Sequence, residues 1–265
     1  MNANLQNPKC LSVVIPVFNE EATLENVVRK VLAVPHLLEV IIVDDGSSDG
    51  TAEVAAAIAA ANPEVRVAQL ARNSGKTAAL RAGFALTQGE VVIVQDADLE
   101  YDPDEIHSVI EPILEGHADV VFGSRFLVRR ATRVLYFYHY VANKLLTFLS
   151  NAFTNLNMTD IETGYKAFRG DIIRNMIIVS SGFGFEVEAT AKIAKLGVPV
   201  YEVPISYYGR TYSEGKKIST IDGIIALWLI IRFNLLCSRS RSFRALPEIA
   251  GRPLIASAVE SDRAS

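Results

Sequence analysis

Short runs of valine and isoleucine alternate with helix-like segments in the first half of the chain, and this alternation limits the possible fold most. The runs lie at residues 11–18, 37–44, 65–70, 90–96 and 118–124. Strands buried on both faces read as continuous apolar runs, and helices between strands favour parallel pairing. The sequence therefore predicts an α/β fold with a mostly parallel sheet flanked by helices.

The segments between and after these runs carry signals for helices. We expect helices at residues 20–33, 51–61, 75–87, 134–156 and 185–196, and a further strand at 162–169. Ser48 or Asp49 can cap the second helix, and Asp102 is expected to cap one more. Gly89 is expected to close the third helix and Gly197 the last.

Composition narrows the class of protein. The chain has 265 residues, half of them hydrophobic, which is enough for the core of one ordinary domain. Its net charge of −4 offers no basic field, so we expect no nucleic-acid partner. Cys10 and Cys237 lie far apart, which favours a reducing, cytoplasmic setting. We expect no signal peptide, and no segment reaches the ~20 uninterrupted apolar residues that span a bilayer.

Several of the expected strands are followed by polar residues. These residues are Asp44, Asp45, Asn73, Asp96, Asp98, Ser124 and Arg125. In open α/β sheets, ligands bind outside the carboxyl ends of the strands. We therefore expect these residues to converge on one edge of the sheet and to form a ligand site there.

Residues 96–104 are dense in carboxylates, which repel one another unless a cation joins them. Asp98 and Glu100 are two residues apart, so both can face one side of an extended segment. Such a pair suits Mg²⁺ or Mn²⁺, which complete their shells with water and substrate phosphates. The four histidines are scattered, which argues against a zinc site. Asp102 and Asp104 are instead expected to cap the next helix and to be solvated.

Five stretches together resemble the glycosyltransferases of family 2, in order and in spacing. They are VVIPVFNE, IIVDDGSSDGT, RNSGKTAALRAGF, QDADLEYDP and GSRF. The later stretches TDIETGYKAFR, GFGFEVE and GRTYSEGKK resemble the polyprenyl-phosphate branch of that family, which dolichyl-phosphate mannose synthase typifies. The resemblance covers most of residues 10–235 and implies the GT-A fold, a Rossmann-like sheet.

The resemblance also implies a divalent metal on the donor diphosphate, Mg²⁺ or Mn²⁺. Asp98 and Glu100 would be its ligands, with Asp96 close to the metal, the ribose and the diphosphate. The branch often has glutamine where this chain has Glu100, which would change the charge of the site.

A larger set is expected to hold the nucleotide sugar. It comprises Pro16, Val17, Asn19, Glu20, Asp45, Lys76, Asp96, Ala97 and Glu186. By resemblance, Asp45 contacts the base and Glu186 lines the sugar site, although Glu186 can equally serve the dipole of its helix. Lys76 follows Gly75 as in a phosphate-binding loop, but the motif fails because residue 70 is leucine. At a helix N-terminus, Lys76 can still lie near phosphates.

The acceptor decides whether a general base is needed. A sugar hydroxyl needs one, whereas a phosphate monoester has a second pKa of about 6 and is mostly dianionic at pH 7. A phosphate acceptor needs cations instead. The resemblance implies that Arg125 and Arg133 bind the acceptor phosphate and that Lys216 joins them from a later loop. With Asp98 they form the expected catalytic set.

The expected function is inverting transfer of a hexose to a polyprenyl or dolichyl phosphate, without a covalent enzyme intermediate. The donor would be a nucleotide sugar such as GDP-mannose or UDP-glucose. Two alternatives stay open. One is a family 2 enzyme with a saccharide acceptor, which would need a base such as Asp171 or Asp222. The other is a catalytically silent nucleotide-binding module.

A lipid acceptor requires contact with a membrane. The apolar segments 134–156 and 221–237 have arginine flanks that suit amphipathic helices at an interface, although both can equally be core helices. We expect peripheral attachment to the cytoplasmic face of the membrane, with a membrane-protein partner possible. The expected division is a tail 1–9, a GT-A catalytic domain 10–220, a membrane-proximal helix 221–237 and a disordered tail 238–265.

Overall fold

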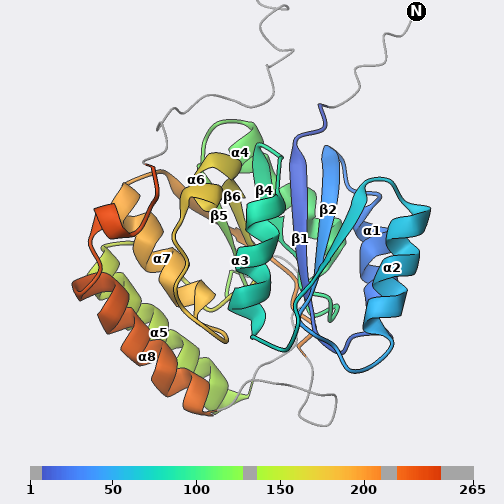
Figure 1. Ribbon diagram of the computed structural model, residues 1–265. Coiled ribbons are helices and arrows are strands. Elements are labelled where there is room, and N and C mark those ends of the chain that lie inside the picture. The colour runs from blue at the N-terminus through green and yellow to red at the C-terminus, as the bar shows by residue number, and fades with distance from the viewer. Residues whose placement is uncertain (1–7, 128–135, 210–219, 246–265) are drawn as a thin grey trace, which may run out of the picture.

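In the part of the chain that the structure describes, seven strands form one sheet, and helices cover both of its faces (Figure 1). The structure, a computed structural model, describes residues 8–127, 136–209 and 220–245. The strands are β1 (Leu11–Val17), β2 (Leu37–Asp44), β3 (Val65–Gln69), β4 (Val91–Val94), β5 (Val120–Ser124), β6 (Lys166–Arg169) and β7 (Val200–Pro204). Their order in the sheet is β3-β2-β1-β4-β6-β5-β7.

Strand directions confirm the mostly parallel sheet. All neighbouring strands pair in parallel except β6, which runs antiparallel to both β4 and β5. From β1 the sheet grows through β2 and β3 to one side, whereas β4 lies on the other side. Loops at such a switch point diverge and leave room for a ligand.

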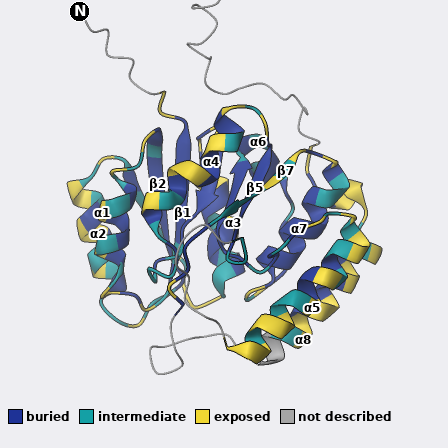
Figure 2. Cartoon of the chain, turned by 180° about the vertical axis from the view of Figure 1, so that it is seen from behind, coloured by how far each residue is buried: buried dark blue, intermediate teal, exposed yellow. Residues whose placement is uncertain are grey.

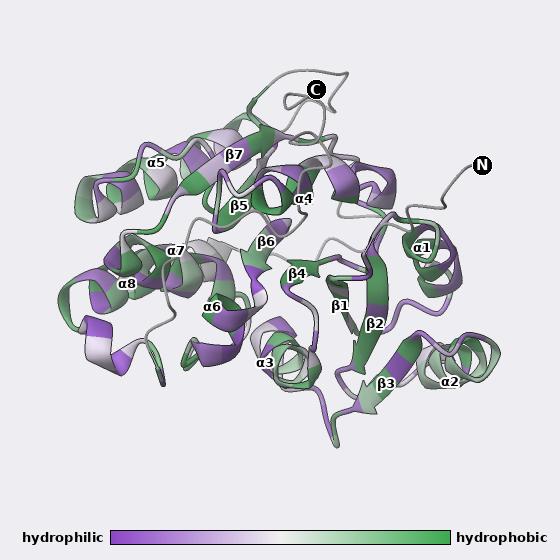
Figure 3. Cartoon of the chain, turned by 90° about the horizontal axis from the view of Figure 1, so that it is seen from above, coloured by the Kyte–Doolittle hydropathy of each residue, from purple (hydrophilic) through white to green (hydrophobic). Residues whose placement is uncertain are grey.

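The helices form layers on the sheet. They are α1 (Leu24–Val31), α2 (Thr51–Ala61), α3 (Lys76–Leu86), α4 (Ile106–Leu114), α5 (Phe137–Thr154), α6 (Gly170–Asn175), α7 (Phe185–Leu196) and α8 (Thr220–Leu235). Helices α1, α2 and α4 contribute to one hydrophobic cluster, and α3, α6 and α7 to the other. Figure 3 shows α4 and α3 on opposite sides of the sheet. Helices α5 and α8 pack against each other and against α7 as an outer layer (Figure 1).

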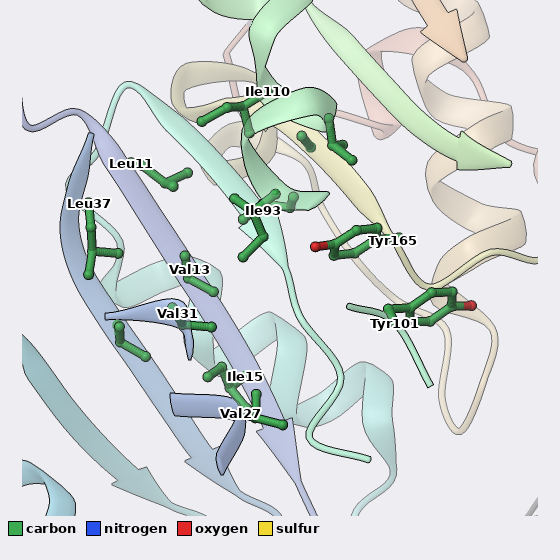
Figure 4. Packing of buried hydrophobic residues seen from close by; sticks show 14 of the residues in the cluster. Leu11, Val13, Ile15, Val27, Val31, Leu37, Ile93, Tyr101, Ile110 and Tyr165 are labelled. Atoms are coloured by element: carbon green, nitrogen blue, oxygen red, sulfur yellow. The ribbon is translucent and has the colours of Figure 1, made fainter. Parts of the chain in front are cut away.

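Alternate residues of β1 enter the two hydrophobic clusters. Leu11, Val13 and Ile15 pack on the α1 side (Figure 4), whereas Val14 packs on the α3 side, and all four are fully buried. This burial on both faces is the physical reason why the strand reads as an uninterrupted apolar run.

Most of the helix-end signals agree with the structure. The side chain of Asp102 accepts a hydrogen bond from the amide of Asp104, before the short 3-10 turn Pro103–Glu105 that leads into α4. Asp49 accepts from the amide of Thr51 at the start of α2. Gly197 ends α7 with φ of 70°. The ends at Asp102 and Gly197 were correctly predicted, whereas the N-cap residue of α2 is Gly50, one position after Asp49.

Two helix ends differ from the prediction. The first helix begins at Leu24 rather than at residue 20, and the amide of Glu20 is bonded to the side chain of Thr51. Gly89 does not close α3, whose C-cap is Thr87. At Gly89 the backbone instead passes close to Cys10, since a Cβ on Gly89 would lie 2.5 Å from the carbonyl oxygen of Cys10.

The second half of the sheet was predicted less well. The strand expected at 162–169 begins only at Lys166, and β7 and α6 were not expected. β7 lies at the edge of the sheet, where it pairs with β5, and it is mostly half-buried. It therefore lacks the continuous apolar run that revealed the central strands.

The expected disordered tail is wrong for residues 238–245. Arg239–Arg241 form a 3-10 turn, and Phe243 is buried and bridges to Met176. One large apolar side chain thus anchors a segment that otherwise reads as small and polar. Residues 1–7 and 246–265 lie outside the described residues.

The outer helices α5 and α8 each bury one side and expose apolar side chains on the other. Ile230 and Phe233 of α8 are buried in the core, whereas Trp228 and Ile224 are exposed, as is Phe148 of α5. Figure 2 shows exposed stretches along both helices. Each helix therefore has a core face and an apolar outer face. Within the described residues, no helix combines the length and the apolar character that crossing a membrane requires.

Candidate active site

A cavity of about 340 Å³ lies at the carboxyl ends of the central strands. The expected site residues that line it are Pro16, Val17, Glu20, Asp45, Lys76, Asp96, Ala97, Asp98, Glu100, Arg125 and Glu186. Asn73, which follows β3, lines it as well. Residues far apart in the sequence thus meet at the switch point, as expected from their places at the strand ends.

Asn19 supports the loop after β1 from outside the cavity. It adopts a left-handed conformation with φ of 54° and does not line the cavity. Its side-chain oxygen accepts from the amide of Ser48, and its own amide donates to the hydroxyl of Ser47. Asn19 therefore ties the loop after β1 to the loop after β2.

Asp45 holds the loop that precedes α3. Its two carboxylate oxygens accept hydrogen bonds from the amides of Ser74 (2.8 Å) and Gly75 (2.7 Å). Gly75 has φ of 89°, and a Cβ there would lie 2.9 Å from the Cα of Gly182. Asp45 both lines the cavity and shapes its wall.

Lys76 links two acids at one end of the cavity. Its Nζ lies 2.8 Å from Oδ1 of Asp96 and 3.3 Å from Oε1 of Glu186. Burial disfavours its charge, but Asp96 and Glu186 outweigh burial and raise the pKa of Lys76 far above its usual value. Lys76 therefore stays protonated and neutralises part of this acidic end.

The acidic segment after β4 is a turn rather than an extended strand. Leu99 adopts φ of 59°, a left-handed conformation that bulky residues rarely take. Asp98 accepts from the amide of Glu100, and Glu100 accepts from the hydroxyl of Tyr207 at 2.8 Å. The expectation of an extended segment is wrong, yet both carboxylates line the same cavity.

The donor set suits a divalent ion that takes most of its ligands from elsewhere. Among the described residues, no three His, Cys, Asp or Glu side chains form a metal-binding group. Asp98 and Glu100 supply hard oxygen donors at the cavity, whereas Asp96 is paired with Lys76. Mg²⁺ and Mn²⁺ accept such sites, since water and phosphate oxygens complete their shells. The residues present therefore fit the expected ion.

Arg125 enters the cavity as half of a buried ion pair. Its Nε and Nη2 donate to the two carboxylate oxygens of Asp160, at 2.6 and 2.8 Å. Burial opposes both charges, but each partner outweighs burial, so the pKa of Arg125 is raised and that of Asp160 is lowered. The guanidinium carbon also lies 5.2 Å from the centre of the Tyr207 ring. Arg125 is thus fixed in place before any substrate arrives.

Of the remaining expected residues, two are not described by the structure and two lie elsewhere. Arg133 and Lys216 fall outside the described residues, so their expected roles stay predictions. Asp102 and Asp104 do not line the cavity and lie 2.8 and 3.3 Å from Nζ of Lys30. Their expected place away from the site is confirmed.

The stretch TDIETGYKAFR supplies cavity residues to which the sequence analysis gave no role. Glu162 and Gly164 line the cavity, as do Tyr101 and Tyr207. The amide of Gly164 donates to the hydroxyl of Tyr101, and burial raises the pKa of Tyr101 to about 12. Family resemblance singled out the stretch, but only the fold brings it opposite the acidic turn.

Comparisons with known proteins agree with this geometry. Residues 12–177 match the family described as glycosyl transferase family 2. Undecaprenyl-phosphate mannosyltransferase from Micrococcus luteus is 33% identical, with 79% of this chain and 88% of that protein covered. Polyprenol monophosphomannose synthase from Mycolicibacterium smegmatis is 31% identical, with 77% of this chain and 79% of that protein covered.

A solved structure shares the fold. Glucosyl-3-phosphoglycerate synthase from Mycobacterium tuberculosis, in complex with Mn²⁺, UDP and glucosyl-3-phosphoglycerate, superposes with a TM-score of 0.65. The match covers 85% of this chain and 80% of that chain at 20% sequence identity. The family match spans more than half of the sequence, and the cavity lies where the fold places its ligands. The chain therefore belongs to glycosyl transferase family 2 and has the GT-A fold.

Proposed function

We propose that this protein transfers a hexose from a nucleotide sugar to the phosphate of a polyprenyl phosphate, with inversion and with a divalent ion. One observation carries the proposal: a single cavity brings Asp98 and Glu100 together with the buried guanidinium of Arg125. Two relatives that the chain covers for most of their length are named for sugar transfer to undecaprenyl phosphate and for polyprenol monophosphomannose synthesis.

The donor would lie along the loops after β1, β2 and β4. Pro16, Val17 and Asp45 form the wall on which a nucleotide can rest, and Asp98 and Glu100 follow along the same cavity. These two carboxylates would hold Mg²⁺ or Mn²⁺, which when bound offsets the charge of the departing nucleoside diphosphate. Lys76 keeps Asp96 neutralised, which limits the repulsion that a diphosphate would meet.

The acceptor phosphate would lie beside Arg125. Asp160 engages Nε and Nη2, so within the hydrogen bonds of the described residues Nη1 can donate to a phosphate oxygen. Arg133 and Lys216 would add positive charge from neighbouring loops. A phosphate dianion attacks without a general base. Asp160, which is fully buried and paired with Arg125, is therefore not needed as a base.

The step is a single displacement. An oxygen of the acceptor phosphate forms a bond to the anomeric carbon while the bond to the donor diphosphate breaks, so the configuration inverts. NMR of the product tests this step directly. A product with the same anomeric configuration as the donor sugar would contradict it.

The outer faces of α5 and α8 would carry the enzyme to its lipid acceptor. Exposed apolar side chains gather on both helices, and exposed arginines such as Arg232, Arg239 and Arg241 lie on or just after α8. Apolar surface with basic neighbours suits the interface of an anionic membrane. We therefore place the protein peripherally at the cytoplasmic face of the membrane.

A panel of donors and acceptors tests the proposal. GDP-mannose and UDP-glucose are each offered with undecaprenyl or dolichyl phosphate and with Mg²⁺ or Mn²⁺. The proposal predicts a lipid-linked phosphosugar with at least one donor and no product with Asp98→Ala. Transfer only to soluble saccharides would favour the saccharide-acceptor alternative. Nucleotide binding without turnover on any lipid phosphate would favour the silent module.

A further inference from the structure

Two carboxylates in the cavity each keep one buried oxygen without a hydrogen-bond partner among the described residues. They are Oε1 of Glu162, in the loop before β6, and Oε2 of Glu186, at the start of α7. Both side chains line the cavity, and Glu186 is only 5% exposed. A buried carboxylate oxygen without a donor is costly, since desolvation is not repaid by a hydrogen bond.

The cations of this region are already committed to other partners. Lys76 bonds to Asp96 and reaches only the other oxygen of Glu186. Lys166 donates to the carbonyl oxygens of Ile161 and Thr163. Arg125 forms its bidentate pair with Asp160. None of these three cations of the described residues is left to supply the missing donors, and a molecule bound in the cavity can supply them.

The chemistry of that molecule follows from the charge. Two neighbouring carboxylates repel phosphate, so this end of the cavity suits uncharged groups that donate hydrogen bonds. The hydroxyls of a hexose are such groups, whereas the phosphates of donor and acceptor suit the ion and Arg125. Burial, reinforced by the negative charge of Glu186, raises the pKa of Glu162 to about 7. The pair therefore holds less charge near neutral pH than two ordinary carboxylates would.

We propose that Glu162 is a sugar-recognition residue, which together with Glu186 accepts hydrogen bonds from two hydroxyls of the donor hexose. This assignment rests on the proposed function, because it takes the cavity to be the binding site of a nucleotide sugar. It makes Glu162 a determinant of which hexose is accepted. A site built to bond a hydroxyl discriminates strongly against the analogue that lacks it, because its own polar groups are then left unpaired.

Binding measurements separate sugar recognition from nucleotide recognition. Isothermal titration with Mn²⁺ compares the nucleotide sugar preferred by the wild type with the corresponding nucleoside diphosphate, for wild type, Glu162→Ala and Glu162→Gln. The affinity for the nucleotide sugar should fall about tenfold or more in Glu162→Ala, as loss of a hydrogen bond to a charged group predicts. The affinity for the diphosphate should stay within about threefold. Glu53→Gln, in the first turn of α2 and outside the cavity lining, is the matched control.

Deoxy donors identify the bonded hydroxyl. Removal of that hydroxyl should weaken binding to the wild type about tenfold and leave binding to Glu162→Ala nearly unchanged, so the two changes are coupled. Equal weakening of diphosphate and nucleotide sugar by Glu162→Ala, in a variant whose circular dichroism is unchanged, would overturn the assignment. The assignment would also be overturned if no deoxy donor showed coupling with Glu162→Ala. Tighter binding of an amino-sugar donor than of the hydroxylated donor would overturn it as well. Coupling without transfer to any polyprenyl phosphate would support Glu162 in this role and contradict the proposed acceptor instead.

Discussion

Gly164 lies where the cavity leaves no room for a side chain. A Cβ at this position would lie 2.7 Å from Oδ2 of Asp96 and 2.9 Å from Nζ of Lys76. Gly164→Ala should therefore displace the Lys76–Asp96 pair and lower kcat/KM by about tenfold to a hundredfold, as small misplacements in active sites do. Gly223→Ala on α8, where a Cβ meets nothing within 4 Å, should keep activity within about twofold. Full activity of Gly164→Ala would show that this contact is unimportant.

Glu162 should make the free energy of unfolding depend on pH. Its pKa rises from 4.5 to about 7 because of burial and the charge of Glu186; Asp160 also raises it, whereas Lys166 and Arg125 lower it. Between these values the unfolded chain releases a proton that the folded protein retains, so stability falls as the pH rises.

Glu162→Gln removes this titration. Urea unfolding from about pH 5 to about pH 8 should therefore show the wild type losing stability relative to Glu162→Gln, most steeply below about pH 7. A difference between the two proteins that stays constant over this range would contradict the shifted pKa.

Single residues of the site could be predicted from sequence where they belong to a recognisable stretch near a strand end. Asp45, Asp98 and Arg125 were found in this way, and all line the cavity. The partners of Arg125 were not found, because Asp160 and Tyr207 are distant from it in sequence and meet it only through the fold.

The N-termini of α3 and α7 are joined by one hydroxyl. Oγ1 of Thr77 donates to the carbonyl of Gly182 at 2.9 Å and accepts from the amide of Phe185 at 3.1 Å. Thr77→Val keeps the shape but leaves both groups without this partner, which should cost roughly 1–3 kcal/mol of unfolding free energy. Thr77→Ser keeps the hydroxyl and should lose only about 1 kcal/mol for the missing methyl group. Denaturant unfolding of both variants measures the difference, and a Thr77→Val protein at least as stable as Thr77→Ser would refute this role.

The elements of the first half were predictable because β1, β2 and β4 are buried on both faces and leave an uninterrupted apolar signal. β6 carries no such signal. It has only four residues and includes the buried Lys166, whose ammonium is satisfied by backbone carbonyls upstream in the chain. A lysine that is stabilised in this way reads as a surface residue until the fold is known.

At the scale of the whole molecule, the outer faces of α5 and α8 form the surface that we expect to contact a membrane. Trp228 is the only tryptophan of the chain and is 54% exposed on α8, so it reports on this surface. Its fluorescence should shift to shorter wavelength with phosphatidylglycerol vesicles, and less so at high salt, which screens the arginines.

A variant with a negative charge on the same surface tests whether this surface makes the contact. Phe148 of α5 is 68% exposed, so Phe148→Glu should leave the fold intact and weaken vesicle binding by tenfold or more, through lost apolar contact and added repulsion. Absence of any shift in the wild type, at all lipid concentrations, would contradict membrane contact through α5 and α8.

In the proposed reaction, Asp98 and Glu100 hold an ion on the donor while Arg125 holds the acceptor phosphate. The most direct test is the initial rate of transfer to undecaprenyl phosphate as Mn²⁺ is titrated into metal-free wild type and Asp98→Asn. The wild-type rate should rise from near zero with Mn²⁺, and Asp98→Asn should stay at least about a hundredfold slower at saturating ion. Undiminished transfer by Asp98→Asn, or by the wild type in excess EDTA, would contradict it.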